Sequence, residues 1–158
     1  MNSRRDDRLT GVERGRDFVS TINYELKRAE RYRIFLSLVT FNIGPLIDLA
    51  GNGSLKAEAE RARFLGGLHE ALKGAIREVD ALADPTIFKI GLLLPETSRQ
   101  GAEAAARRLT ETLYKFCSDY FKKPADYLVP VEIFSFPDAG GGRGITSFLE
   151  DYSARNIN

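Results

Sequence analysis

Residues 80–95 read DALADPTIFKIGLLLP, and the pattern of this segment is the main guide to the architecture of the chain. The short piece 80–83 leads into Asp84-Pro85-Thr86-Ile87, where aspartate at the first turn position and proline at the second suit a type I turn. Residues 87–94 follow as a strand rich in branched apolar side chains. The pattern therefore predicts a β-hairpin in which strand 87–94 folds back on residues 80–83.

Helical and extended patterns alternate on both sides of this hairpin. Before it, the spacing of apolar residues predicts a helix over 12–31, a buried strand over 34–41, and a helix that opens at Ser54 and ends near Val79. After it, we expect a long helix capped by Thr97 or Ser98, a strand over 127–136, and a short helix from Ile145 to about Arg155.

This order predicts an α/β fold of the α+β sandwich kind, with a mixed central sheet covered by helices. The 158 residues are enough for one domain over 1–158 with its own core, and that domain can be part of a longer multidomain protein.

The composition of the chain excludes some classes of binding partner. Lys and Arg number 23 against 22 acids, a formal charge of +1, which argues against nucleic acid as a partner. No apolar run approaches the roughly 18–20 residues of a membrane span, so no membrane insertion is expected.

The single cysteine, Cys117, lies in a helical apolar run and predicts a buried thiol in a reducing, cytoplasmic setting.

Three motifs resemble one known family. Residues 7–18, DRLTGVERGRDF, are similar to the D-x-L-T-G-L-x-N-R-x-x-F entry of GGDEF domains, the diguanylate cyclase family. Arg77-Glu78-Val79-Asp80 resembles the R-x-x-D inhibitory-site motif of that family, and five residues separate it from the signature position. Residues 91–97, GLLLPET, match the strand after the signature and its exit. The resemblance implies a nucleotide-cyclase-like sandwich with the hairpin at the signature position.

The signature itself is not retained. An ungapped alignment from Asp80 to Pro95 places five other residues at the Gly-Gly-Asp-Glu-Phe positions: Thr86, Ile87, Phe88, Lys89 and Ile90. The family also supplies a metal-binding aspartate at the end of the first strand, where this chain has Thr40. Because Mg²⁺ requires hard oxygen ligands, we expect no metal, no cofactor and no diguanylate cyclase activity.

Arg77 and Asp80 are the candidate ligand-binding residues. In relatives such a pair resembles a receptor for cyclic di-GMP, and a spacing of three at a helix end predicts that both side chains converge on one ligand. A surface ion pair is the alternative. A second arginine would have to come from elsewhere, and four are candidates: Arg61, Arg63, Arg107 and Arg108.

The leading hypothesis is a bacterial regulatory domain of a cyclic di-GMP-related pathway, inactive as an enzyme, that senses cyclic di-GMP and acts on a protein partner or neighbouring domain. One alternative is a protein-interaction or dimerisation module, such as a homodimer, with no nucleotide ligand. Another is GTP binding or residual cyclase activity.

Remaining motifs have structural explanations. The glycine-rich segment 140–144 lacks the Gly-Lys-Ser/Thr ending of a phosphate loop and is expected to connect a strand to a helix. His69, the only histidine, has no second ligand nearby in sequence. Four aromatic residues at helical spacing predict core packing, with a partner-facing surface as the alternative: Tyr114, Phe116, Tyr120 and Phe121.

Overall fold

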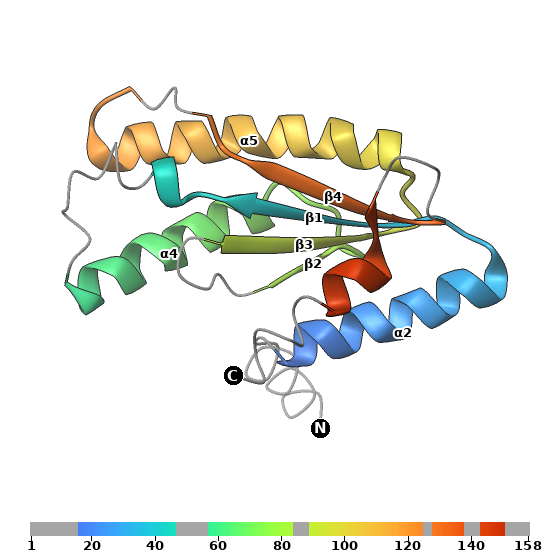
Figure 1. Cartoon of the computed structure of the whole chain (residues 1–158). Coiled ribbons are helices and arrows are strands. Elements are labelled where there is room, and N and C mark those ends of the chain that lie inside the picture. Colours follow the sequence, from blue (N-terminus) through green and yellow to red (C-terminus); the bar gives the residue numbers. More distant parts are fainter. Residues whose placement is uncertain (1–15, 47–56, 84–88, 125–127, 138–142, 151–158) are drawn as a thin grey trace.

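The computed structural model describes residues 16–46, 57–83, 89–124, 128–137 and 143–150. In these residues the strands form one five-stranded sheet in the order β2-β3-β1-β4-β5 (Figure 1). The strands are β1 (Leu36–Asn42), β2 (Ala81–Leu82), β3 (Lys89–Pro95), β4 (Val131–Phe136) and β5 (Arg143–Gly144). The central strand β1 runs antiparallel to both β3 and β4, and β5 pairs in parallel with β4.

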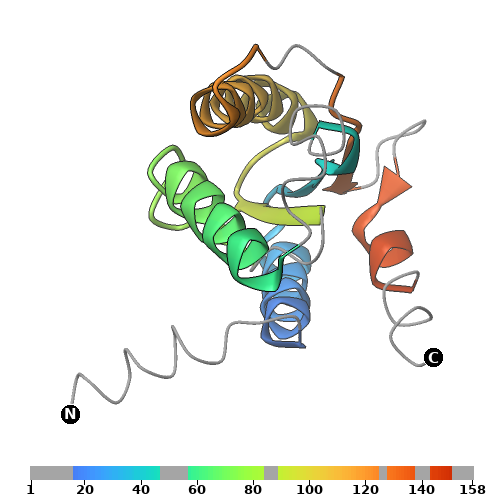
Figure 2. The same cartoon turned by 90° about the vertical axis from the view of Figure 1, so that its left-hand side faces the viewer.

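Helices cover both faces of the sheet, so the domain has three layers (Figures 1 and 2). Helices α4 (Glu58–Lys73) and α5 (Arg99–Phe121) pack on one face. Helix α2 (Arg16–Tyr32) and the helical residues 145–150 pack on the other. The predicted order of elements and the mixed sheet are confirmed.

The alternation of side chains along the strands explains why both faces need cover. Val39 and Phe41 of β1 point into the core under α4 and α5, whereas Leu36 and Leu38 point toward α2. Successive strand residues point to opposite faces. A strand buried on both faces therefore reads as an almost continuous apolar run, which is the pattern of 34–41.

The predicted hairpin is present. Ala81 pairs with Leu93 and Leu82 with Leu92 in antiparallel register, and the Ala83 amide donates to the Gly91 carbonyl at 2.9 Å. Positions 84–88 lie outside the described residues, and the predicted type I turn lies there.

Helix α4 ends earlier than predicted. We expected it to reach Val79, but it stops at Lys73, with Gly74 as its C-cap. Gly74 is a poor helix former, and beyond it the chain forms a turn in which the Asp80 carboxylate accepts a hydrogen bond from the Arg77 backbone amide at 2.8 Å. An aspartate that bonds nearby backbone offers the chain an alternative to the helix. Ser54, the expected N-cap, lies outside the described residues.

Helix α5 begins as expected, with Ser98 as its N-cap and the Ser98 hydroxyl accepting from the Gly101 amide at 3.2 Å. Its aromatic residues pack inward around Phe64 of α4, with ring centroids 5.6, 5.1 and 5.3 Å from those of Phe116, Tyr120 and Phe121. Core packing of these three residues is thus confirmed. None of the described helices is long and apolar enough to cross a lipid bilayer.

Candidate functional site

The first candidate region is the end of the β1–β3 pair at which β1 finishes with Asn42 and β3 begins with Lys89, the fourth signature position. The register places Thr40 opposite Gly91 and Asn42 opposite Lys89. By strand alternation Thr40 and Gly91 face α2, and a Cβ added at Gly91 would lie 3.1 Å from the Phe18 ring. A side chain at position 91 would therefore press on the Phe18 ring, because helix α2 packs closely over the strand.

Of the five signature positions, the first three lie outside the described residues. Lys89 is exposed at the start of β3, and Ile90 is buried in the core under α4 and α5. Ile90 is therefore a core residue of the sheet and does not face a ligand.

The described side chains at this junction do not suit Mg²⁺. Thr40 offers a hydroxyl and Lys89 an ammonium group, while the Asn42 amide oxygen already accepts from the Gly44 amide at 3.0 Å. Magnesium prefers carboxylate oxygens in octahedral geometry. In the part of the chain that the structure describes, no cluster of three acidic, histidine or cysteine residues could hold a metal ion.

The second candidate region surrounds Arg77, in the turn between α4 and β2. Its Nη2 atom donates to Asp80 Oδ1 at 2.8 Å, to the Pro95 carbonyl at 3.0 Å and to Thr97 Oγ1 at 2.8 Å. The Thr97 hydroxyl in turn donates to the Pro95 carbonyl at 2.9 Å. Arg77 thus ties the end of α4 to the link between β3 and α5.

Arg77 and Asp80 differ sharply in exposure. The Asp80 side chain is only 2% exposed, and both of its oxygens accept from Arg77. The Arg77 side chain is 53% exposed, and its hydrogen bonds to Asp80 raise the pKa of the guanidinium. In this structure the two side chains therefore bind each other rather than a shared ligand. Of the two, only Arg77 is exposed enough for a ligand to contact it.

A second arginine lies near this turn, and it is not one of the four candidates. Arg28 of α2 reaches Glu96, 68 residues away, with Nη2 to Oε2 at 3.4 Å, and the Glu96 charge also acts on Arg77. Nothing in the local sequence around Arg28 signals this, because the approach is made by the packing of α2 on the sheet.

Of the four candidate arginines, Arg61 and Arg63 lie on α4, and Arg107 and Arg108 lie on α5. Arg63 pairs with Glu60 on α4 at 3.1 Å. Arg107 and Arg108 are exposed on α5, and Arg107 lines a hollow of about 750 Å³ between α5 and β4 that includes neither Arg77 nor Asp80.

Comparison with known proteins gives structural relatives only. No family model and no curated protein matches this sequence. The diguanylate cyclase SiaD of Pseudomonas aeruginosa, solved in complex with its activator SiaC, is 16% identical with a TM-score of 0.63, over 99% of this chain and 62% of SiaD. The chain thus spans less than two thirds of that protein.

Two further solved structures have a similar fold. The active GGEEF domain of a diguanylate cyclase from Vibrio cholerae is 14% identical with a TM-score of 0.56, over 85% of each chain. A PelD fragment (156–455) from Pseudomonas aeruginosa in the apo form is 19% identical with a TM-score of 0.51, over 96% of this chain and 48% of that one. The chain therefore resembles GGDEF domains and has their fold, as the three motifs predicted.

Proposed function

We propose that this chain is a regulatory GGDEF-fold domain of a cyclic di-GMP-related pathway that does not itself join two GTP molecules. The observation that carries the proposal is the β1–β3 junction, where Thr40, Asn42 and Lys89 lie together in register. A hydroxyl, an engaged amide and an ammonium group replace the carboxylates that metal-assisted phosphoryl transfer requires.

The chemistry explains why these positions decide the activity. In a diguanylate cyclase, the 3′-hydroxyl of one GTP attacks the α-phosphate of another, and Mg²⁺ neutralises the charge that develops. Lys89 could attract a phosphate as a point charge, but it cannot hold the metal.

The test is incubation of the protein with GTP and Mg²⁺ or Mn²⁺, followed by chromatography for cyclic di-GMP. The active Vibrio cholerae domain is the positive control under the same conditions. We expect no product above the no-protein blank. Turnover that grows with protein concentration would refute the proposal.

A second function, cyclic di-GMP recognition, is favoured by the fixed position and the exposure of the Arg77 side chain. Its guanidinium is fixed by Asp80, Pro95 and Thr97 and yet is half exposed, so little conformational entropy is lost when a ligand binds. The Nε and Nη2 atoms already donate to Asp80, Pro95 and Thr97, so a ligand would meet the Nη1 atom and the flat face of the guanidinium, on which a guanine base can stack. In this proposal Arg77 contacts the ligand, Asp80 positions Arg77, and Arg28 supplies the second cation.

Titration calorimetry with cyclic di-GMP and with GTP tests this assignment. We expect micromolar binding of cyclic di-GMP that is lost in Arg77→Ala and weakened in Arg28→Ala. Arg108→Ala, an exposed arginine on α5, is the matched control and should bind as the parent does. If neither nucleotide produces heat, the protein-interaction module without a nucleotide ligand becomes the better account.

A further inference from the structure

We propose that Tyr24 and Tyr32 of α2 each offer an exposed aromatic ring on which a guanine base of cyclic di-GMP stacks. The inference rests on the proposed recognition of this ligand at Arg77, and it adds the residues that hold the bases. In this arrangement arginine side chains contact the phosphates, and the tyrosine rings contact the flat faces of the bases.

Tyr24, Arg28 and Tyr32 form one row along α2, because they are spaced four residues apart. Residues with this spacing are direct neighbours on a helix, with Cβ atoms roughly 5–6 Å apart. The rise of a helix places the two tyrosines about 12 Å apart along its axis. Two rings therefore flank Arg28, the arginine proposed as the second cation of the ligand site.

Arg28 connects this row to the turn that holds Arg77. Its Nη2 atom lies 3.4 Å from Oε2 of Glu96, in the link between β3 and α5. Glu96 also acts electrostatically on Arg77, and Nη2 of Arg77 donates to the carbonyl of Pro95, the residue before Glu96. The row on α2 and the Arg77 guanidinium therefore border the same short segment of chain.

Both rings are open to a ligand. In the part of the chain that the structure describes, five large apolar or aromatic side chains are exposed, and Tyr24 at 65% and Tyr32 at 59% are two of them. A third, Val79, belongs to the turn between Arg77 and Asp80. Single exposed apolar residues are normal on a protein surface, whereas these three are neighbours of the two arginines.

Aromatic rings beside cations match the chemistry of a nucleotide, which carries a flat base and an anionic phosphate. Stacking needs only the face of the base, so it does not depend on free hydrogen-bonding groups. This suits a site in which Nη2 of Arg77 already donates to three acceptors, in Asp80, Pro95 and Thr97.

The Tyr32 ring is held in position by a neighbouring cation. The guanidinium carbon of Arg31 lies over this ring, 5.5 Å from its centroid. A contact of this kind covers one face of the ring and leaves the opposite face for a base. Because the ring is already restrained, less conformational entropy is lost when the base stacks on it.

Titration calorimetry of tyrosine variants with cyclic di-GMP tests the two rings. Tyr24→Ala and Tyr32→Ala should each weaken binding about tenfold, since stacking of one base on an aromatic side chain contributes on that order. Tyr24→Phe and Tyr32→Phe keep the ring and should bind as the parent does. Both positions are exposed, so thermal melts of all four variants should stay within about 2 °C of the parent.

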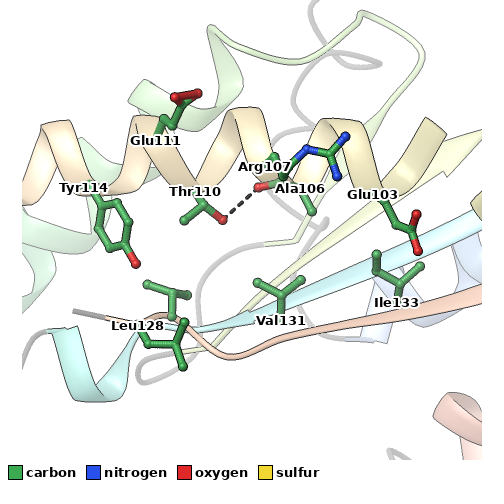
Figure 3. Close-up of a pocket in the computed structure, with 10 residues that line it drawn as sticks. Glu103, Ala106, Arg107, Thr110, Glu111, Tyr114, Leu128, Val131 and Ile133 are labelled. Carbon is green, nitrogen blue, oxygen red and sulfur yellow. Dashed lines mark hydrogen bonds between the residues drawn. The ribbon is translucent and has the colours of Figure 1, made fainter. Parts of the chain in front are cut away.

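Tyr114→Ala is the matched control. Figure 3 shows the Tyr114 ring pointing from α5 into the hollow between α5 and β4, which includes neither Arg28 nor Arg77. Removal of this ring should leave the affinity for cyclic di-GMP unchanged. An equal loss in Tyr114→Ala would show a general effect of aromatic removal on the fold and would count against the proposal.

Tyrosine emission provides a readout other than affinity. The chain has six tyrosines and no tryptophan, so its emission comes from tyrosine alone. After correction for absorption by the ligand, saturating cyclic di-GMP should quench this emission, because a stacked base quenches a tyrosine ring. In the double variant Tyr24→Phe, Tyr32→Phe, binding should persist and the quenching should be lost.

The outcomes separate this inference from the proposed recognition at Arg77. If Arg77→Ala abolishes binding while both tyrosine-to-alanine variants bind as the parent does, the stacking role is wrong and the recognition at Arg77 stands. Quenching that persists in the double phenylalanine variant would also overturn the stacking role. A parent protein that binds no cyclic di-GMP would overturn both.

Discussion

Two adjacent glycines of α4 allow a direct test of how α4 packs on α5. A Cβ added at Gly67 would lie 2.9 Å from Cζ and 3.2 Å from Cε1 of Phe116, whereas one added at Gly66 would meet no atom within 4 Å. The changes Gly66→Ala and Gly67→Ala are chemically identical and one residue apart. They differ only in whether the new methyl group meets the α5 helix.

The expected magnitudes follow from this difference. Alanine stabilises a helix interior by about 1 kcal/mol relative to glycine, so Gly66→Ala should raise the free energy of unfolding by about that amount. Gly67→Ala makes the same gain but pushes on a ring held in the Phe64 cluster, and overpacking of this kind costs about 1–3 kcal/mol. The two variants should therefore differ by about 1–3 kcal/mol, with Gly67→Ala the less stable.

Urea unfolding followed by circular dichroism measures both values, and thermal melts should show Gly66→Ala raised by about 2–4 °C. Phe116→Leu is the companion change, because a shorter side chain makes room for the methyl group. The cost of Gly67→Ala should fall in that background. Equal stability of the two alanine variants would show that Phe116 does not lie over Gly67, and would refute the packing described for α4 and α5.

Three other predictions concern the sites and the core. Restoring Gly-Gly-Asp-Glu at positions 86–89 will not yield cyclic di-GMP from GTP, because Thr40 still lacks a carboxylate; product from that variant would contradict the assignment of the metal position. Asp80→Ala should lower the free energy of unfolding by about 1–3 kcal/mol in urea titration, since the Arg77 amide and guanidinium lose their acceptor, whereas Asp119→Ala on the exposed face of α5 should change it by less than about 0.5 kcal/mol. Burial raises the pKa of the Cys117 thiol to about 12. The folded state therefore holds this proton longer than the unfolded state, and the stability it contributes is present below the ordinary thiol pKa and is lost as the pH rises toward about 12. The fall in urea midpoint between pH 8 and pH 11 should be smaller in Cys117→Ala, and a thiol reagent at pH 8 should label Cys117 only after unfolding.

The agreement between sequence and structure is greatest where one residue pattern has one physical solution. The apolar run at 34–41 had to be a strand buried on both faces, and β1 is buried in this way. Ser98 stands before the periodic pattern of a helix, and it caps α5 through the Gly101 amide. Cys117, in a helical apolar run, is fully buried.

The candidate site was predicted less well, because its geometry depends on contacts between distant parts of the chain. Arg77 and Asp80 are three residues apart in the sequence, and from this spacing we predicted that both side chains would lie on one side of a helix end and contact one ligand. In the structure these residues lie in a turn, with Asp80 at 2% exposure beneath Arg77. Helical periodicity alone could not predict that an aspartate side chain would compete with the helix for the Arg77 amide.

Residue type and local spacing were enough to predict the order of the helices and strands and the hairpin between residues 80–83 and the strand that follows. The approach of Arg28 to Glu96 across 68 residues, and the parallel pairing of β5 with Phe134 and Ser135 of β4, became visible only in the folded chain. Such placements follow from how whole elements pack on the sheet, and no local stretch of residues encodes that packing.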